Sequence, residues 1–164
     1  MADRVAVYKE GGIQQIAALE ELYHKPANLF VAGFIGAPAM NFFDATLTRK
    51  NGDVILDAEW FKIILPGSLI ESVGIQEMPS EVVIGIRPEH VRIHKEKVPG
   101  SIETKIYVVE PLGSETIIDF KIGETIYKIK YYGDLKFDTG DRIYVTFDID
   151  KIHIFDKETG KAIV

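Results

Sequence analysis

Residues 22–41 carry a short apolar helix signal that is bounded by helix breakers on both sides. Pro26 cannot lie inside a helix, so it ends whatever helix holds the residues before it. Asn28 is a good N-terminal cap for the apolar segment of residues 29–35, and Gly36 ends that segment. A helix that is apolar on every side must be buried. We therefore expect a joint here, packed between an N-terminal unit and a C-terminal domain.

The residues before this joint predict a β-hairpin and a short helix. Residues 4–8 and 13–16 are strand-like and flank the turn Lys9-Glu10-Gly11-Gly12. The helix covers roughly Ala17 to His24. Two strands alone are barely stable in water, so the hairpin needs another body to pack against.

From Phe42 onward the hydrophobic period changes to two, which is typical of β-strands. Asn51-Gly52 between two strand-like runs indicates a type I′ hairpin, and Gly123-Glu124 marks a second turn. Along residues 142–149 the apolar side chains alternate with polar ones, which places one face of that strand inward. Many short strands with regular turns predict a closed barrel or a sandwich, and periodicity does not choose between them.

The composition of the chain argues against several classes of function. The formal net charge of −6 and the pI near 5.2 argue against sequence-independent nucleic-acid binding, which needs a basic surface. The absence of cysteine excludes disulfides and thiolate metal sites. No segment reaches the roughly 20 apolar residues that a membrane helix needs, and no signal peptide is recognisable at the start. We expect a cytoplasmic chain whose membrane association comes only through partners.

No motif for catalysis or metal binding stands out in the sequence. Because the chain has no Gly-x-x-x-x-Gly-Lys-[Ser/Thr] string that could hold phosphates, we expect no ATP hydrolysis, no cofactor and no enzyme activity from this chain. His90 and His94 would be about 13 Å apart on a strand, too far to share one zinc ion. We therefore favour solvated or hydrogen-bonded histidines over a metal site, and assign no role to His24 or His153. Acidic residues crowd the C-terminal third and are interpreted as surface charge: Asp134, Asp138, Asp141, Asp148, Asp150 and Asp156.

Four groups of residues, in order, carry a resemblance to a known family. They are Glu20-Glu21-Leu22-Tyr23 with Pro26-Ala27-Asn28, residues 30–36, Pro38 and Met40-Asn41; Gly85-Ile86-Arg87-Pro88-Glu89-His90; Glu110-Pro111-Leu112-Gly113-Ser114-Glu115-Thr116; and His153-Ile154-Phe155-Asp156 with Thr159-Gly160. Together they resemble the ATP-binding subunits of carbohydrate ABC importers of the maltose-transporter type. The resemblance covers essentially the whole chain.

The resemblance implies a fold, a domain division and a function. The fold is mainly β: an OB-like/TOBE (MOP-like) barrel preceded by a short β-hairpin and two short helices. Residues 1–36 would be the end of an ATPase domain and residues 37–164 the regulatory barrel. The complete subunits bind ATP and magnesium and couple ATP hydrolysis to sugar uptake through membrane subunits at the cytoplasmic face. We therefore expect a shortened form of a longer polypeptide that acts as a regulatory and dimerisation domain.

Six residues are candidates for a regulatory or dimer interface by this resemblance: Arg87, Pro88, Glu89, Glu110, Gly113 and Glu115. A simpler interpretation is also open for the first three, in which Pro88 ends a strand and Arg87 pairs with a carboxylate such as Glu89. The tyrosines at 127, 131 and 132 could be interface or ordinary barrel surface.

The partners implied are a second copy of the chain, the transporter membrane subunits and a regulatory protein, with no nucleic acid. We also expect the N-terminal hairpin and the residue 29–35 helix to pack on the barrel or across a dimer. An alternative function is a small-ligand module that binds an oxyanion or a sugar. A binder of single-stranded nucleic acid is a third class, which the acidic charge disfavours.

Overall fold

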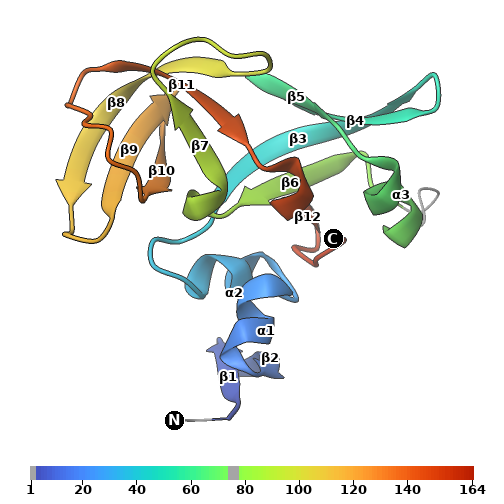
Figure 1. Cartoon of the computed structure of the whole chain (residues 1–164). Helices are drawn as coiled ribbons and strands as arrows, with labels where there is room; N and C mark the ends of the chain where they lie inside the picture. Colours follow the sequence, from blue (N-terminus) through green and yellow to red (C-terminus); the bar gives the residue numbers. More distant parts are fainter. Residues whose placement is uncertain (1–2, 74–77) are drawn as a thin grey trace.

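The computed structural model describes residues 3–73 and 78–164 and separates a small N-terminal unit from a larger β domain (Figure 1). The N-terminal unit, residues 3–36, consists of β1 (Val5–Lys9), β2 (Gly12–Ala17), α1 (Leu19–His24) and α2 (Leu29–Phe34). β1 and β2 form an antiparallel hairpin of their own. The expected hairpin and both helices are thus confirmed, although α1 begins at Leu19 because β2 continues through Ala17.

The β domain contains two five-stranded sheets that are entirely antiparallel in their pairings. One sheet has the order β12-β6-β3-β4-β5, with β3 (Asn41–Lys50), β4 (Asp53–Ala58), β5 (Phe61–Ile64), β6 (Glu81–Ile86) and β12 (His153–Asp156). The other has the order β10-β9-β8-β11-β7, with β7 (Val91–His94), β8 (Ile102–Pro111), β9 (Thr116–Ile122), β10 (Thr125–Tyr131) and β11 (Arg142–Phe147). The mainly β fold expected from the sequence is therefore confirmed.

Local turn chemistry explains the hairpins of this domain. Asn51 and Gly52 both have positive φ, as a type I′ turn requires, and they connect Lys50 to its partner Asp53. Gly123 also has a positive φ and lies in the two-residue turn between β9 and β10. Such turns match the right-handed twist of the strands and so fix the register of each hairpin.

The curled sheets enclose one apolar core. Side chains from both sheets contribute to it, among them Phe43, Leu56 and Ile84 from the first, and Ile118, Phe120, Ile129, Ile143 and Val145 from the second. Burial of a large apolar side chain is worth roughly 1.5–3 kcal/mol. Because the alternation along β11 puts Ile143 and Val145 inside, a one-residue slip of that strand would expose both side chains.

Asn41 connects the two sheets where β3 begins. Its Nδ2 donates to the backbone oxygen of Lys128 at 2.8 Å, and its Oδ1 accepts from the backbone N–H of Lys128 at 2.8 Å. Asn41 is buried and belongs to the first sheet, whereas Lys128 lies on β10 at the edge of the second. One side chain therefore satisfies a backbone donor and a backbone acceptor across the seam.

The joint of residues 22–41 lies against the β domain as expected. The Asn28 side chain accepts from the Val31 N–H at 2.9 Å, which confirms its predicted role as the cap of α2. Ala32 packs in one cluster with Met40, Val83 and Phe155 of the β domain. The segment after β12 also holds the joint, because the Leu29 N–H donates to the Gly160 oxygen and the Ala162 N–H donates to the Ala27 oxygen, both at 2.9 Å.

Three expectations need correction. α3 (Gly67–Val73) follows β5, in a part of the chain where the sequence predicted only strands and turns. Phe34 is 66% exposed, so α2 is not buried on every side. Ile149 is 38% exposed because it begins η3 (Ile149–Lys151) rather than continuing the alternation of β11.

Among the described residues, no helix is both long and apolar enough to span a bilayer.

Candidate functional site

Arg87 lies between the N-terminal unit and the β domain and is only 1% exposed. It follows β6 and precedes η2 (Pro88–His90), a short turn that the proline starts. Its Nη1 donates to the Ile35 oxygen at 2.5 Å and more weakly to the Ala32 oxygen at 3.4 Å, while its Nη2 donates to the Tyr23 oxygen at 2.7 Å. One guanidinium group thus binds the C-terminal ends of both α1 and α2.

These contacts overturn the simpler interpretation of Arg87. A carboxylate partner such as Glu89 was expected, but the partners are three backbone carbonyls. The Arg87 guanidinium also lies 3.9 Å from the centre of the Tyr23 ring, a cation–π arrangement. The last carbonyls of a helix have no partner within the helix and carry partial negative charge, so a fixed cation suits them.

Two glycines allow this close approach. A Cβ on Gly85 would collide with the Met40 sulfur and lie 2.9 Å from the Phe155 ring. A Cβ on Gly36, where φ is +117°, would lie 3.0 Å from Arg87 Nη1. The backbone therefore needs glycine at both positions for the joint to close around Arg87.

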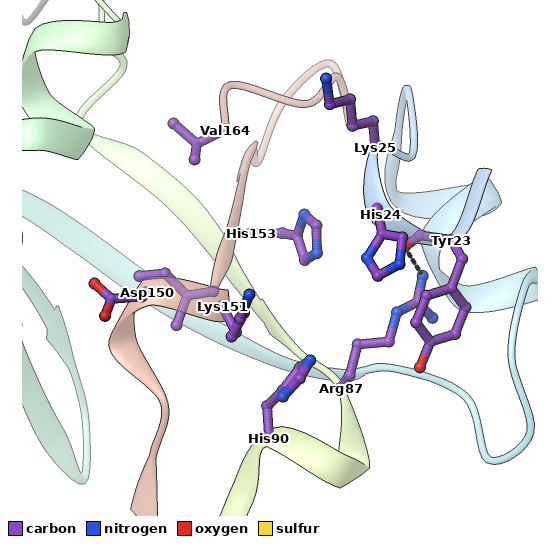
Figure 2. Close-up of a pocket in the computed structure, with 10 residues that line it drawn as sticks. Tyr23, His24, Lys25, Arg87, His90, Asp150, Lys151, His153 and Val164 are labelled. Carbon is purple, nitrogen blue, oxygen red and sulfur yellow. Dashed lines mark hydrogen bonds between the residues drawn. The ribbon is translucent and has the colours of Figure 1, made fainter. Parts of the chain in front are cut away.

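Next to Arg87 is a cavity of about 370 Å³ between the N-terminal unit and the β domain. Ten residues line it: Tyr23, His24, Lys25, Arg87, His90, Asp150, Lys151, Ile152, His153 and Val164. In Figure 2 the imidazole rings of His24, His90 and His153 and the ammonium end of Lys151 converge on its centre. The Asp150 carboxylate points away from that centre, so the groups that converge are basic.

Burial shapes the charge of these groups. Desolvation lowers the pKa of Arg87 to about 10, so the guanidinium remains protonated at neutral pH. Desolvation, with smaller contributions from Arg87, His90 and His24, lowers the pKa of His153 to about 4. Desolvation also lowers the pKa of His90, against the opposing effect of Glu89 and Asp148. The cavity thus holds a permanent cation beside neutral imidazoles that resist protonation.

The structure divides the six interface candidates into two groups on different elements. Arg87 and Pro88 are buried and Glu89 is half-buried at η2. Glu110 and Gly113 are exposed at the turn between β8 and β9. Glu115, in the same turn, pairs with Lys130 at 3.1 Å. Contact of either group with a partner stays a prediction, but Arg87 uses its donors inside the chain.

The remaining polar candidates have local partners. His94 lies 3.0 Å from the Thr146 hydroxyl, while Asp148 forms a two-point ion pair with Arg92 at 2.6 and 3.0 Å. Asp156 accepts from the N–H groups of Glu158 and Thr159, both at 2.8 Å. Tyr127 is buried against Phe43, whereas Tyr132 is exposed.

Sequence reasoning did not bring together the residues that line the cavity. His24, His90 and His153 come from α1, η2 and β12, and Lys151 from η3. No spacing along the chain connects these positions. The one available signal was the Gly85–His90 motif, which identified Arg87 but not its surroundings.

Two family models match consecutive segments of the chain. A MalK OB fold domain matches residues 36–91, and a TOBE domain matches residues 84–155. The two matches overlap at residues 84–91, the segment that contains Arg87.

Curated relatives match along 99% of the chain. The trehalose/maltose import ATP-binding protein MalK of Thermococcus litoralis is 40% identical, and this chain covers 45% of its length. The xylose/arabinose import ATP-binding protein XacK of Haloferax volcanii is 37% identical, with 42% of its length covered. The multiple sugar-binding transport ATP-binding protein MsmK of Streptococcus mutans is 34% identical, with 46% covered. The chain therefore spans less than half the length of these relatives and aligns with their C-terminal part.

Among solved structures, the cytoplasmic molybdate-binding protein ModG in a molybdate-bound form is similar in fold. The TM-score is 0.55 at 11% sequence identity, over 70% of this chain and 94% of that chain. At this identity the likeness shows a common fold.

Proposed function

We propose that this chain, which carries the MalK OB fold and TOBE domains and aligns with the C-terminal part of MalK-type sugar importer ATP-binding subunits, is a regulatory and dimerisation domain. In a complete subunit of this kind it would lie at the cytoplasmic face, behind an ATPase domain that couples ATP hydrolysis to sugar uptake through membrane subunits. Catalysis, with ATP and magnesium, would belong to that preceding domain.

The observation that carries this proposal is the connection made by Arg87. Its three hydrogen bonds to the ends of α1 and α2 fix the N-terminal unit on the β domain. The same unit exposes several large apolar side chains: Tyr8, Ile13, Ile16, Leu19 and Phe34. Exposed apolar surface of this extent suits contact with another body, such as the remainder of an ATPase domain. The joint would then transmit the position of that domain to the regulatory domain.

A chimera tests the proposal directly. This chain would replace the C-terminal part of the Thermococcus litoralis relative, and the hybrid would be assembled with that protein's membrane subunits in vesicles. We expect ATP-driven uptake of trehalose or maltose. An Arg87→Met chimera should still hydrolyse ATP but take up less sugar, because the joint is loosened. Equal uptake by the relative without any C-terminal domain would contradict a regulatory or coupling role.

Dimerisation is tested on the chain itself by sedimentation velocity. We expect a concentration-dependent dimer that the charge reversal Glu110→Arg weakens. Glu124→Arg, in the exposed turn between β9 and β10, is the matched control and should leave the dimer intact. A wild-type chain that stays monomeric at all concentrations would remove dimerisation from the proposal.

A second candidate function is a small-ligand module, which the basic cavity beside Arg87 favours. The ModG structure with the same fold has molybdate bound. Equilibrium dialysis with molybdate, sulfate and maltose separates this function from a purely structural one, since only a ligand module retains one of them.

A further inference from the structure

The basic side chains that line the cavity beside Arg87 come from two parts of the molecule. His24 and Lys25 come from the end of α1, whereas Lys151 and His153 come from η3 and β12 of the β domain. A group that binds them together would therefore bridge the N-terminal unit and the β domain. Any such ligand acts on the joint itself.

A carboxylate approaches one member of this lining, because Asp148 Oδ2 lies 3.7 Å from His90 Nδ1, but the two fixed cations have no such partner among the described residues. In the described ranges 3–73 and 78–164, neither Arg87 nor Lys151 forms an ion pair with an aspartate or glutamate. Asp150, the one acidic residue of the lining, directs its carboxylate away from the centre (Figure 2). A buried charge normally has a counter-charge, because its desolvation is costly. Arg87 departs from this pattern.

Arg87 contributes its charge to the cavity rather than a direct contact. Its Nη atoms are occupied by carbonyls, and its Nε is covered and has no hydrogen-bond partner among the described residues. The guanidinium therefore raises the electrostatic potential of the cavity, while Lys151 and the imidazoles of His24, His90 and His153 supply donors that a ligand can reach. Ammonium and imidazolium groups form short, charge-assisted hydrogen bonds to oxyanions.

The two fixed cations of the lining favour an anion over a cation as the ligand. The fixed charges of Arg87 and Lys151 repel metal ions, and no metal-binding cluster of histidine and acidic side chains was found in the described part of the chain. The volume of about 370 Å³ is far larger than the roughly 30 Å³ that one water molecule occupies in the liquid. It lies in the size range of small-molecule pockets.

We propose that this cavity binds a phosphate-class oxyanion, either free or as the phosphoryl group of a small metabolite. Lys151, His153 and His24 bind its oxygens, and Arg87 provides the fixed counter-charge. Binding favours the protonated form of His153, because a negative charge within a few ångströms stabilises a charged imidazole. The bound anion connects α1 to η3 and β12 and so tightens the joint. This inference rests on the small-ligand function proposed above and names its ligand class, and it does not depend on the role of the chain in transport.

Calorimetric titration of the chain at pH 6.5, in a buffer free of phosphate and at constant ionic strength, tests the proposal. The probes are inorganic phosphate, sulfate and glucose 6-phosphate, with glucose as the neutral control. We expect saturable one-to-one binding of the anions and none of glucose. Equal affinities for phosphate and glucose 6-phosphate would assign the site to the free anion. Tighter binding of the ester would assign it to a phosphorylated metabolite.

Variants locate the binding site. Lys151→Gln and His153→Gln should each weaken binding about tenfold, the effect of losing one charged hydrogen bond. Lys97→Gln removes the same charge as Lys151→Gln from an exposed position outside the cavity and should leave the affinity unchanged. Thermal unfolding monitored by circular dichroism checks that each variant is folded.

Histidine-ring signals in NMR spectra give a second readout that does not need the variants. Phosphate should shift the ring signals of His24, His90 and His153 but not that of His94, which does not line the cavity. The proposal would be overturned if Lys97→Gln weakened anion binding as much as Lys151→Gln and His153→Gln. It would also be overturned if phosphate shifted the ring signals of all four histidines alike. The absence of any saturable heat would overturn it as well.

Discussion

The N-terminal unit and the β domain show two different ways of holding a fold together. The β domain surrounds a continuous apolar core that is supplied by both sheets. The N-terminal unit has a small core formed by Val7, Ala17, Leu22, Val31 and Ile35, and it exposes apolar side chains on its hairpin and helices. Its attachment to the β domain combines the apolar cluster around Ala32 with hydrogen bonds to backbone carbonyls, above all those from Arg87.

The contrast shows which part of the chain can fold by itself. A core that spans two curled sheets can offset the conformational entropy of ordering the strands, whereas a two-stranded hairpin with two short helices has too little buried surface to do so. The N-terminal unit therefore takes its stability from the β domain. Four changes test this difference.

Phe120→Ala should have the largest effect. Phe120 is fully buried on β9 and lies against Tyr127 at 5.8 Å between ring centres. Removing a buried aromatic ring costs about 3–5 kcal/mol, so urea denaturation should show that much loss in the free energy of unfolding of the whole chain. Leu22→Ala, in the small core, is the comparison. It should remove hydrogen-exchange protection from residues 3–36 only, and equal loss of protection in both regions would show one cooperative unit.

Arg87→Met should detach the N-terminal unit without unfolding the β domain. Methionine retains much of the apolar volume but offers no donors, so the carbonyls of Tyr23 and Ile35 lose their partner at roughly 1–3 kcal/mol each. Limited proteolysis should cleave within residues 3–36 much faster than in the wild type. Arg87→Lys keeps the charge with fewer, differently placed donors and should give an intermediate rate. An unchanged cleavage rate in both variants would show that the joint does not depend on these bonds.

His153 should make stability depend on pH. Its folded pKa of about 4 is below the ordinary value of 6.5, so between these values the unfolded chain binds the proton more readily. The contribution of His153 to the free energy of unfolding is fully present above about pH 6.5. It falls as the pH drops toward 4, by at most about 1.4 kcal/mol per pH unit. The charged groups that act on it are Arg87, His90 and His24, and Lys151 also points into the cavity, whereas the Asp150 carboxylate points away.

Urea denaturation at several pH values, in a buffer without phosphate, measures this dependence. The slope should be smaller in His153→Gln, since glutamine does not titrate. His94→Gln, outside the cavity, should retain the wild-type slope. Equal slopes in wild type and His153→Gln would contradict the assignment.

Asn28→Ala should have the smallest effect. Loss of the cap that binds the Val31 N–H costs about 1 kcal/mol, and the bond from Asn28 Nδ2 to Gln14 at 2.9 Å is lost with it. Hydrogen exchange at the first turn of α2 should accelerate. Asn28→Asp keeps the cap acceptor but cannot donate to Gln14, so it separates the two contributions. Identical behaviour of both variants would assign the effect to the Gln14 bond instead.

The elements that the sequence predicted are those whose signals are local. Asn51 and Gly52 form their turn through their own positive φ angles. Asn28 starts α2 by accepting a hydrogen bond from Val31, three positions later. The alternation along β11 likewise predicted its buried face. α3 was not predicted because Pro66 and Gly67, where it begins, are typical of a turn rather than of a helix. These outcomes depend on short-range chemistry alone.

The candidate site could not be predicted in the same way. Arg87 was identified through a motif, but its partners Tyr23 and Ile35 are more than fifty positions earlier in the chain. His24 and His153 are separated by most of the sequence. They line the same cavity because the segment after β12 is hydrogen-bonded to the start of α2. Such contacts follow from the packing of whole elements, which no local pattern encodes.

Asn41 has a consequence for how the β domain is completed. Its amide acts as a strand one residue long, offering Lys128 the same donor and acceptor that a neighbouring peptide group would. This pair of bonds therefore fixes where the start of β3 lies along β10. A leucine there would leave both backbone groups of Lys128 without a partner across the seam, although β9 would still hold β10 in register. An unpaired strand edge of this kind is open to pairing with a strand from another molecule.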